Sequence, residues 1–318
     1  MDIVVSEASR QRELQADPPP GFMAVGRATR SQPVVNAMTI DVEDYFQVQA
    51  LSHCFRRSDW PTMECRVERN TARILSMLAE HDCKATFFTL GWIAERYPHL
   101  LREIHALGHE IASHGLAHYR VDQQTPDAFR SDIRRAKAVL EGVTGAAVRG
   151  YRAATFSIGW DNLWAFDVLA EEGYSYSSSI YPIRHDLYGM PGAPRFAFRP
   201  REGSSLLECP ISTITVGGRV LPCGGGGYFR LLPYRVSRRL LKRLNQTEGQ
   251  SAVFYFHPWE IDPEQPRPRG LPARARARHY VNLTRMEGRL RRLLADFLWS
   301  RMDRVFPDAL PCSPRATP

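Results

Sequence analysis

Short apolar runs alternate with segments of helical periodicity over residues 37–262. Strands are predicted for five apolar runs, at 37–42, 85–90, 109–112, near 146–150 and at 251–256. Helices are predicted where apolar residues recur every three or four positions, at 66–80, 98–107, 125–140 and 161–172. Strands that alternate with helices favour an α/β fold, with a parallel sheet or a (β/α) barrel. In such folds the chemistry gathers at the carboxyl ends of the strands.

Composition divides the chain into three regions. Residues 1–36 are polar, contain Pro18-Pro19-Pro20 and show no periodicity, so we expect a disordered N-terminal tail. Residues 37–262 form the predicted α/β barrel domain, with a loop insertion near 183–233 that is rich in proline and glycine. Residues 263–318 form a basic extension whose terminal helix is expected to pack on the barrel.

Charge and hydropathy indicate which binding partners and which cellular compartment to expect for the protein. The formal charge is +8, with much of the excess in the C-terminal third, which could attract acidic polymers or form a solvated basic face. No aromatic residues interleave with the basic ones as in an RNA-binding sheet, so no nucleic-acid partner is expected. The chain has no apolar run of transmembrane length and no secretory signal pattern, which predicts a cytoplasmic protein without a transmembrane segment.

Two clusters of potential metal ligands follow predicted strands. Asp41, Glu43 and Asp44 close the first strand, and clustered carboxylates are costly unless they bind a metal, form ion pairs or transfer protons. His114 and His118 follow the strand at 109–112, and imidazoles at this spacing can converge on zinc or a similar divalent ion. Taken singly, a solvated acidic turn and two surface histidines remain alternatives.

Two further polar residues end predicted strands. Arg152 follows the strand near 146–150 and can hold a carboxylate in place. His257 ends the apolar strand at 251–256, where an imidazole suits a general acid. Each could be structural alone, but acids, histidine pair, arginine and histidine all occur at strand ends, which favours one shared site. Tyr45, Tyr151 and Trp259 are aromatic residues near these positions that could contact a substrate bound there.

These segments carry a resemblance to a known family. The chain resembles the polysaccharide deacetylases of the NodB-homology type, carbohydrate esterase family four, over residues 36–262. The acid cluster is similar to the family's first motif, and Ser113 to His118 to its highly specific second motif. Gly150-Tyr151-Arg152, Tyr174 to Pro182 and His257 are similar to the third, fourth and fifth motifs. The segments 257–263 and 278–283 resemble the subgroup associated with exosortase (PEP-CTERM) exopolysaccharide gene clusters.

The resemblance implies a distorted (β/α) barrel with fewer than eight strands and removal of acetyl groups from an N-acetylated polysaccharide. It implies a divalent metal, usually zinc, held by one acid and two histidines. In this sequence these are His114 and His118, with either Glu43 or Asp44 as the acid. Asp41 is then the implied catalytic base, oriented by Arg152, and His257 the acid that protonates the leaving amine.

Three positions depart from the family pattern. Val42 stands where a second aspartate is usual, Ala154 where a proline is usual, and Ser177 where the fourth motif has aspartate. The first leaves the choice between Glu43 and Asp44 open, although the two-residue period of a strand favours Glu43. The other two keep a catalytically impaired sugar-binding module as an alternative. Hydrolysis of a small cyclic amide is the other alternative.

Overall fold

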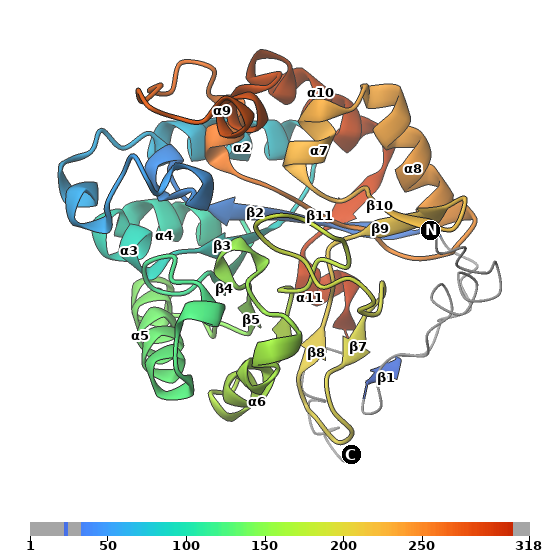
Figure 1. Ribbon diagram of the computed structural model, residues 1–318, viewed down its shortest axis with the longest axis horizontal. Helices are drawn as coiled ribbons and strands as arrows, with labels where there is room; N and C mark the ends of the chain where they lie inside the picture. The colour runs from blue at the N-terminus through green and yellow to red at the C-terminus, as the bar shows by residue number, and fades with distance from the viewer. Residues whose placement is uncertain (1–21, 25–32, 308–318) are drawn as a thin grey trace, which may run out of the picture.

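A curled sheet of parallel strands forms the centre of the computed structural model, which describes residues 22–24 and 33–307 (Figure 1). In the described chain, seven neighbouring strands run parallel in the order β8-β6-β5-β4-β3-β2-β11. Their bounds are β2 Val35–Val42, β3 Thr86–Thr89, β4 Glu110–Ser113, β5 Gly150–Tyr151, β6 Tyr176–Ser177, β8 Leu207–Glu208 and β11 Val253–Phe256. Because β2 lies between β3 and β11, the first motif follows a strand that is paired on both sides.

Loop residues, instead of an eighth strand, connect the two edges of the parallel sheet. The Ser212 N–H donates to the carbonyl oxygen of Val253 at 3.3 Å, and the Tyr255 N–H donates to that of Gly224 at 2.8 Å. The described part of the chain therefore forms a distorted (β/α) barrel with fewer than eight regular strands. This confirms the predicted fold class.

Most helices cover the outside of the barrel, and those between the first strands follow one another around it in chain order (Figure 1). Those between the first strands are α2 Val67–Glu80, α3 Gly91–Arg96, α4 Pro98–Ala106, α5 Pro126–Thr144 and α6 Trp164–Glu171. The later ones are α7 Gly226–Leu231, α8 Tyr234–Gln246, α9 Ala273–Tyr280, α10 Leu283–Asp296 and α11 Met302–Val305. Helix α3 was not anticipated from the sequence, since its six residues are too few to show a period.

Helix α5 shows how local sequence sets these elements. Thr125 caps its N-terminus by accepting a hydrogen bond from the Ala128 N–H at 3.3 Å, and Pro126 occupies its first turn. Gly145 ends it in a left-handed conformation with φ 67°, which glycine adopts without strain. Phe129, Ile133, Ala136 and Leu140 share the face buried against the barrel.

Short strands extend the sheet beyond the barrel. β7 Phe198–Arg199 pairs antiparallel with β8, and β1 Met23–Ala24 pairs antiparallel with β7. β12 Leu298–Ser300 pairs in parallel with the start of β2. β1 falls within the predicted N-terminal tail, of which residues 1–21 and 25–32 lie outside the described residues.

The predicted loop insertion near 183–233 contains ordered elements. Besides β7 and β8 it holds the hairpin of β9 Thr213–Val216 and β10 Arg219–Pro222, and helix α7. Its glycine run packs closely on the barrel, because a Cβ on Gly224 would lie 2.3 Å from the Val253 carbonyl oxygen. A Cβ on Gly226 would lie 2.3 Å from Glu260 Oε1. These glycines therefore allow α7 to lie directly against the mouth of the barrel.

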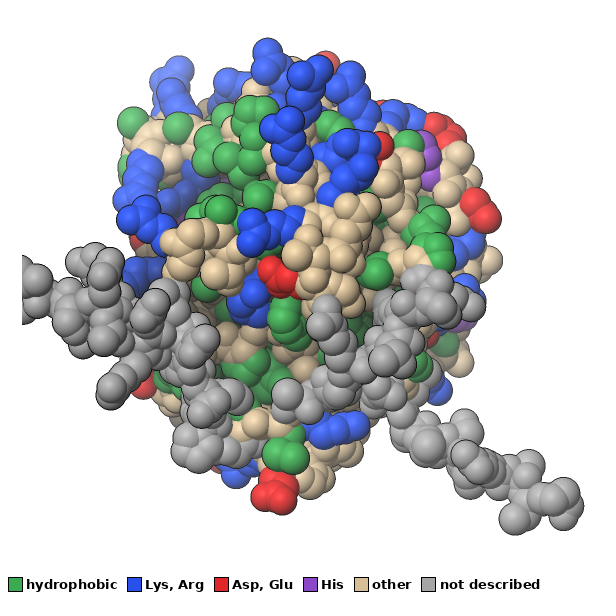
Figure 2. All heavy atoms as spheres, turned by 90° about the vertical axis from the view of Figure 1, so that its right-hand side faces the viewer, with side chains coloured by type: hydrophobic (Ala, Val, Ile, Leu, Met, Phe, Trp, Pro, Cys, Tyr) green, Lys and Arg blue, Asp and Glu red, His purple; other side chains and the backbone are tan. Residues whose placement is uncertain are grey.

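Many basic side chains of the C-terminal third face outward. Figure 2 shows lysine and arginine gathered on the face where α8 and α10 lie. Helix α8 buries Ser237, Leu241 and Leu244 and exposes its arginine-rich side, as expected for an amphipathic surface helix. Among the described residues, no helix combines the length and apolar character required to cross a bilayer.

Candidate metal centre and active site

The end of β2 separates the three acids of the first motif. Asp41 and Glu43 lie two residues apart and both line the pocket at the barrel mouth, whereas Val42 packs into the hydrophobic core. Asp44 instead accepts hydrogen bonds from the backbone N–H groups of Tyr45 and Val67, at 2.8 and 2.9 Å. Burial raises the pKa of Asp44 to about 6. The structure thus brings Glu43 toward the histidines and gives Asp44 a capping position.

Glu43, His114 and His118 form a compact cluster of buried ligand atoms, all within 4.8 Å of one another. His118 Nε2 lies 2.9 Å from Glu43 Oε2. His114 Nδ1 donates to the carbonyl oxygen of Arg152 at 2.9 Å, so the lone pair of its Nε2 is free to bind a metal. Two imidazole nitrogens and one carboxylate oxygen are a donor set that catalytic zinc sites use. The residues present therefore fit a divalent cation.

The loop after β4 brings both imidazoles to one point. Gly115 and His118 have positive φ angles of 76° and 53°, and Asp132 Oδ2 accepts the Leu116 N–H at 3.2 Å. A positive φ at a histidine is uncommon and is maintained by its surroundings. The result is a tight turn in which the rings of His114 and His118 have centroids 5.3 Å apart.

Arg152 fixes Asp41 inside the barrel. The guanidinium group is fully buried and its Nη1 donates to Asp41 Oδ1 at 2.6 Å and to Thr39 Oγ1 at 2.8 Å. The other side of the group donates to the carbonyl oxygen and Oγ of Ser178 at 3.0 and 2.9 Å. A buried charge held by this many acceptors cannot change rotamer easily. Asp41 is therefore presented to the pocket with one oxygen engaged and the other free to accept a proton.

A carboxylate from another strand, that of Glu208, lies beside the fourth-motif position Ser177. Ser177 Oγ forms a hydrogen bond with Ser179 Oγ at 2.7 Å. Glu208, which pairs with Ser177 across β6 and β8, accepts the N–H groups of Ser179 and Ile180 at 2.9 Å each. A carboxylate thus anchors the segment whose Ser178 binds Arg152. Burial raises the pKa of Glu208 to about 7.

His257 faces the two acids and is itself held from behind. Its Nε2 lies 3.3 Å from Glu43 Oε1 and 3.9 Å from Asp41 Oδ2. Its Nδ1 donates to Glu260 Oε1 at 2.8 Å, and Glu260 Oε2 accepts from Arg230 Nε at 2.6 Å. Burial would lower the pKa of His257, but Glu43 and Glu260 outweigh it and raise the value to about 8. The Nδ1 bond leaves Nε2 directed at the pocket.

The neighbouring histidines lower the pKa of Glu43, just as Glu43 raises that of His257. Burial alone would raise the pKa of Glu43, but His118, His257 and His114 outweigh burial and lower it to about 2. His114 is different, because burial lowers its pKa to about 4. At neutral pH the cluster therefore offers a carboxylate and a neutral imidazole, the protonation states in which both groups bind metals.

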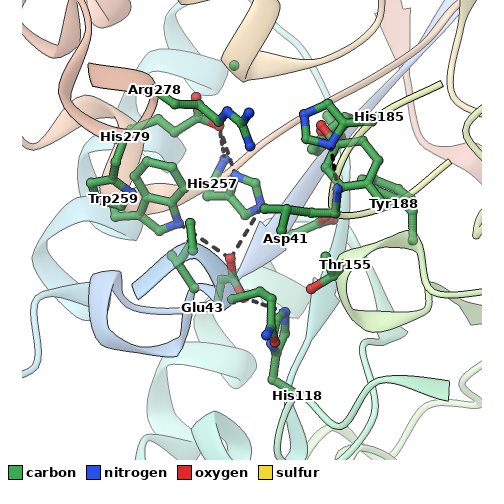
Figure 3. Close-up of a pocket in the computed structure, with 18 of the residues that line it drawn as sticks. Asp41, Glu43, His118, Thr155, His185, Tyr188, His257, Trp259, Arg278 and His279 are labelled. Atoms are coloured by element: carbon green, nitrogen blue, oxygen red, sulfur yellow. Dashed lines mark hydrogen bonds and ion pairs between the residues drawn. The ribbon is translucent and has the colours of Figure 1, made fainter. Parts of the chain in front are cut away.

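Figure 3 shows Asp41, Glu43, His118 and His257 converging on one pocket. Its volume is about 130 Å³. Trp259 forms one wall: its ring stacks between those of His257 and His279, with centroid distances of 5.0 and 4.3 Å. Its Nε1 donates to Glu43 Oε1 at 3.4 Å. The pocket thus joins a candidate metal centre, a carboxylate–arginine pair and a histidine.

Tyr45 and Tyr151, predicted to contact sugar, lie in the core and do not line this pocket. Each is 1% exposed. The 3-10 helix that begins at Tyr45 turns its ring against Phe46, at a centroid distance of 5.2 Å. Tyr151 precedes Arg152 in an extended segment, so its side chain takes the opposite face and packs against Phe129 on α5. The prediction placed them by sequence proximity to the motifs, which does not determine the direction of a side chain.

Several pocket residues were not singled out from the sequence. Glu260 lies three residues after His257, and the 3-10 turn Pro258–Ile261 places its carboxylate under that imidazole. This spacing was a local signal that could have identified it. Arg230 and His279 come from α7 and α9, which reach the pocket through long-range packing. No local pattern marks Arg230, whereas His279 lies in the segment 278–283 that resembles the exosortase-associated subgroup.

The fold and the pocket define a class of architecture, a (β/α) barrel with a histidine–carboxylate centre at the strand ends. Two solved structures share the fold. One is a Mycobacterium smegmatis protein named for polysaccharide deacetylase activity, with a TM-score of 0.55, 22% identity, and coverage of 93% of this chain and 99% of that one. The other is Puue allantoinase, with a TM-score of 0.57, 15% identity, and coverage of 90% and 93%.

Sequence comparisons show which proteins parts of the chain are similar to. Residues 59–174 match the family described as polysaccharide deacetylase, and residues 178–307 match a domain of unknown function, DUF3473. A chitooligosaccharide deacetylase from Sinorhizobium fredii is 34% identical over 112 residues, which is 35% of this chain and 49% of that protein. A peptidoglycan-N-acetylglucosamine deacetylase from Bacillus cereus is 34% identical over 82 residues, 26% of this chain and 30% of that protein. The chain spans half or less of the length of these two relatives. Residues 59–174 are therefore similar to the polysaccharide deacetylase family.

Proposed function

We propose that this protein removes N-acetyl groups from a polysaccharide that contains N-acetylhexosamine, and that it does so with a divalent cation, zinc. The observation that carries the proposal is the meeting of Glu43, His114 and His118 with Asp41 and His257 in one pocket. The names of the relatives support the substrate class, since they are deacetylases of chitooligosaccharide and of peptidoglycan N-acetylglucosamine.

Glu43, His114 and His118 would hold the cation, while Asp44 would cap the turn behind it. When bound, the cation polarises the acetyl carbonyl and lowers the pKa of a water molecule beside it. The Nδ1 bond of His114 to the Arg152 carbonyl orients one ligand, as outer contacts do in zinc sites.

Asp41 is the proposed base. Its Oδ1 is held by Arg152 while Oδ2 faces His257, so Oδ2 can accept the proton of the attacking water. The water oxygen forms the new bond to the acetyl carbon and the carbon–nitrogen bond breaks. His257 Nε2 then gives its proton to the departing amine, with Nδ1 anchored on Glu260. Acetate and a free amino sugar are the products.

We further propose that the chain belongs to the exosortase-associated subgroup and acts in exopolysaccharide biosynthesis. The segments 257–263 and 278–283 support this, and both fall within the DUF3473 match. In the structure these segments supply Trp259, Glu260, Arg278 and His279 to the pocket. The residues typical of the subgroup thus line the same pocket as those typical of the family.

The test combines metal analysis with acetate release. Protein stripped with a chelator and reloaded with Zn²⁺ should bind about one equivalent and release acetate from fully N-acetylated chitotetraose. His114→Ala should lose both properties, whereas His105→Ala, an exposed histidine on α4, should keep both. Asp41→Asn should retain the metal and lose acetate release by a factor of about 100 or more.

Two results would contradict the proposal. Full acetate release by the stripped protein would remove the cation from the reaction. Hydrolysis of allantoin without acetate release would favour the cyclic-amide alternative, which the barrel shared with Puue allantoinase makes worth assaying in the same preparations.

A further inference from the structure

A second, larger cavity lies beside the catalytic pocket. Its volume is about 680 Å³ and it lies between the segment 184–188, helix α7 and helix α9. It shares His185, Tyr188, Gly227 and Arg278 with the catalytic pocket, so the two are continuous. In Figure 3 Arg278, His185 and Tyr188 lie on the side of His257 away from His118.

The volumes of the two cavities indicate which part of a bound polymer each could hold. Small-molecule sites usually measure about 300–1,000 Å³. The catalytic pocket, at about 130 Å³, is below that range and has room for an acetamide group and part of a ring. The neighbouring cavity, at about 680 Å³, can hold whole sugar units. Most of the contact with a polymeric substrate would therefore be made outside the catalytic pocket.

The larger cavity carries a surplus of positive charge. Arg184, Arg274 and Arg278 line it together with one carboxylate, that of Asp186, so three guanidinium groups against one carboxylate leave two positive charges. Asp186 lies 3.1 Å from Arg278 and 3.6 Å from Arg274. The side chain of Arg274 is 80% exposed, so it can turn toward a ligand at little cost.

The walls between these charges suit a sugar ring. Tyr188 stacks on His185 with ring centroids 3.9 Å apart, and Tyr228 lines the cavity from α7. Burial and the nearby Arg278 lower the pKa of His185, so its imidazole is neutral at pH 7 and adds no charge. Aromatic walls with guanidinium groups at the rim match a ring that carries a carboxylate.

We propose that this cavity binds an acidic sugar, a hexuronate, next to the N-acetylhexosamine whose acetamide enters the catalytic pocket. The substrate is then an anionic polymer in which the two sugar types are neighbours. This inference rests on the proposed function, because it takes the catalytic pocket as the place where the acetamide is bound. Arg274 and Arg278 pair with the carboxylate, and Tyr188 and Tyr228 contact the rings.

The experiment compares matched oligosaccharides by calorimetry. The acidic probes are tetrasaccharides of alternating glucuronic acid and N-acetylglucosamine, one α-linked and one β-linked. Each is paired with its carboxyl-reduced form, which has the same linkages and no charge. The wild-type protein should bind at least one acidic probe about tenfold more tightly than its reduced form at low salt, since one exposed charge pair contributes up to about a factor of five and two are available. The preference should shrink in 0.5 M NaCl.

Variants test whether Arg274 and Arg278 cause the tighter binding of the acidic probes. Arg274→Gln combined with Arg278→Gln should bring the ratio of affinities close to one. Arg276→Gln, on the same helix but outside the lining of both cavities, should leave the ratio unchanged. A wild-type protein that binds neither acidic probe, or that binds the two members equally in both pairs, overturns the inference. So does a preference that survives the double substitution.

The two proposals can fail separately. Acetate release from neutral chitotetraose without any preference for acidic probes leaves the proposed function intact and overturns the acidic-sugar site. A charge preference that the double substitution removes, in a protein that releases no acetate from any probe, supports the site and refutes the deacetylase activity.

Discussion

The chain of contacts behind His257 can be tested by replacing Glu260 with glutamine. Its carboxylate accepts from His257 Nδ1 at 2.8 Å and from Arg230 Nε at 2.6 Å. Glutamine has nearly the same shape but a single acceptor oxygen, so it can satisfy only one of the two donors. The substitution therefore removes a charge and a hydrogen bond without creating a cavity.

The expected loss of stability follows from the burial of Arg230, which is 2% exposed. Removing one partner of a buried ion pair typically costs about 3–5 kcal/mol, because the other charge stays buried. Arg230 keeps two carbonyl acceptors, those of His279 and Val281, at 2.8 and 2.9 Å. We therefore expect the lower end, a decrease of about 3 kcal/mol in the free energy of unfolding.

The effect on activity has a separate cause. Without the carboxylate, the imidazole loses the partner that fixes its tautomer and favours its protonated form, so kcat should fall about 100-fold. Urea unfolding gives the stability, acetate release gives kcat, and ¹⁵N chemical shifts of His257 report the tautomer. Glu264→Gln, at an exposed site nearby, is the control and should change none of the three. If Glu260→Gln kept kcat within twofold and left the imidazole shifts unchanged, the positioning role of Glu260 would be refuted.

Four further substitutions test other parts of the site. Glu43→Gln should weaken Zn²⁺ binding at least about 100-fold. Asp44→Asn should retain the metal and lose about 1–2 kcal/mol of stability. Equal loss of metal in both variants would contradict the assignment of Glu43 as the metal ligand. Glu208 has a folded pKa of about 7, above its ordinary 4.5, so its stabilising contribution is present below pH 4.5 and is lost as pH rises through 7. Glu208→Gln should therefore exceed the wild type in urea unfolding by less than about 1 kcal/mol at pH 5 and by up to about 3 kcal/mol at pH 8; a constant difference would refute this. Gly226→Ala should lower kcat about tenfold or more, because its Cβ would lie 2.3 Å from Glu260 Oε1 and displace that carboxylate. An unchanged kcat would contradict the close approach of Gly226 to Glu260.

The strand ends could be predicted because local rules determine them. Alternation along β2 directs Asp41 and Glu43 into the barrel and Val42 into the core, which is why the two-residue period favoured Glu43 as the ligand. Helices α2, α4 and α5 were predicted to within a few residues, because each has a clear apolar face.

Features that depend on distant packing could not be predicted. Arg230 reaches Glu260 because the glycine run lets α7 approach the barrel mouth, and nothing in the sequence around either residue specifies that approach. The direction of Tyr45 is set by a 3-10 turn that begins after the strand. The anchoring role of Glu208 depends on the pairing of β6 with β8, two strands separated by the whole segment 178–206.

The two family matches describe parts of one barrel. Residues 59–174 contain His114, residues 178–307 contain His257, and Asp41 precedes both. Their boundary falls beside β6, which pairs with β5 on one side and β8 on the other, so a cut there would divide a continuous sheet. β2 pairs with β3 from the first match and β11 from the second, and this places its acids between the histidines of both. The domain of unknown function therefore supplies half of the candidate active site, and the deacetylase match alone cannot form it.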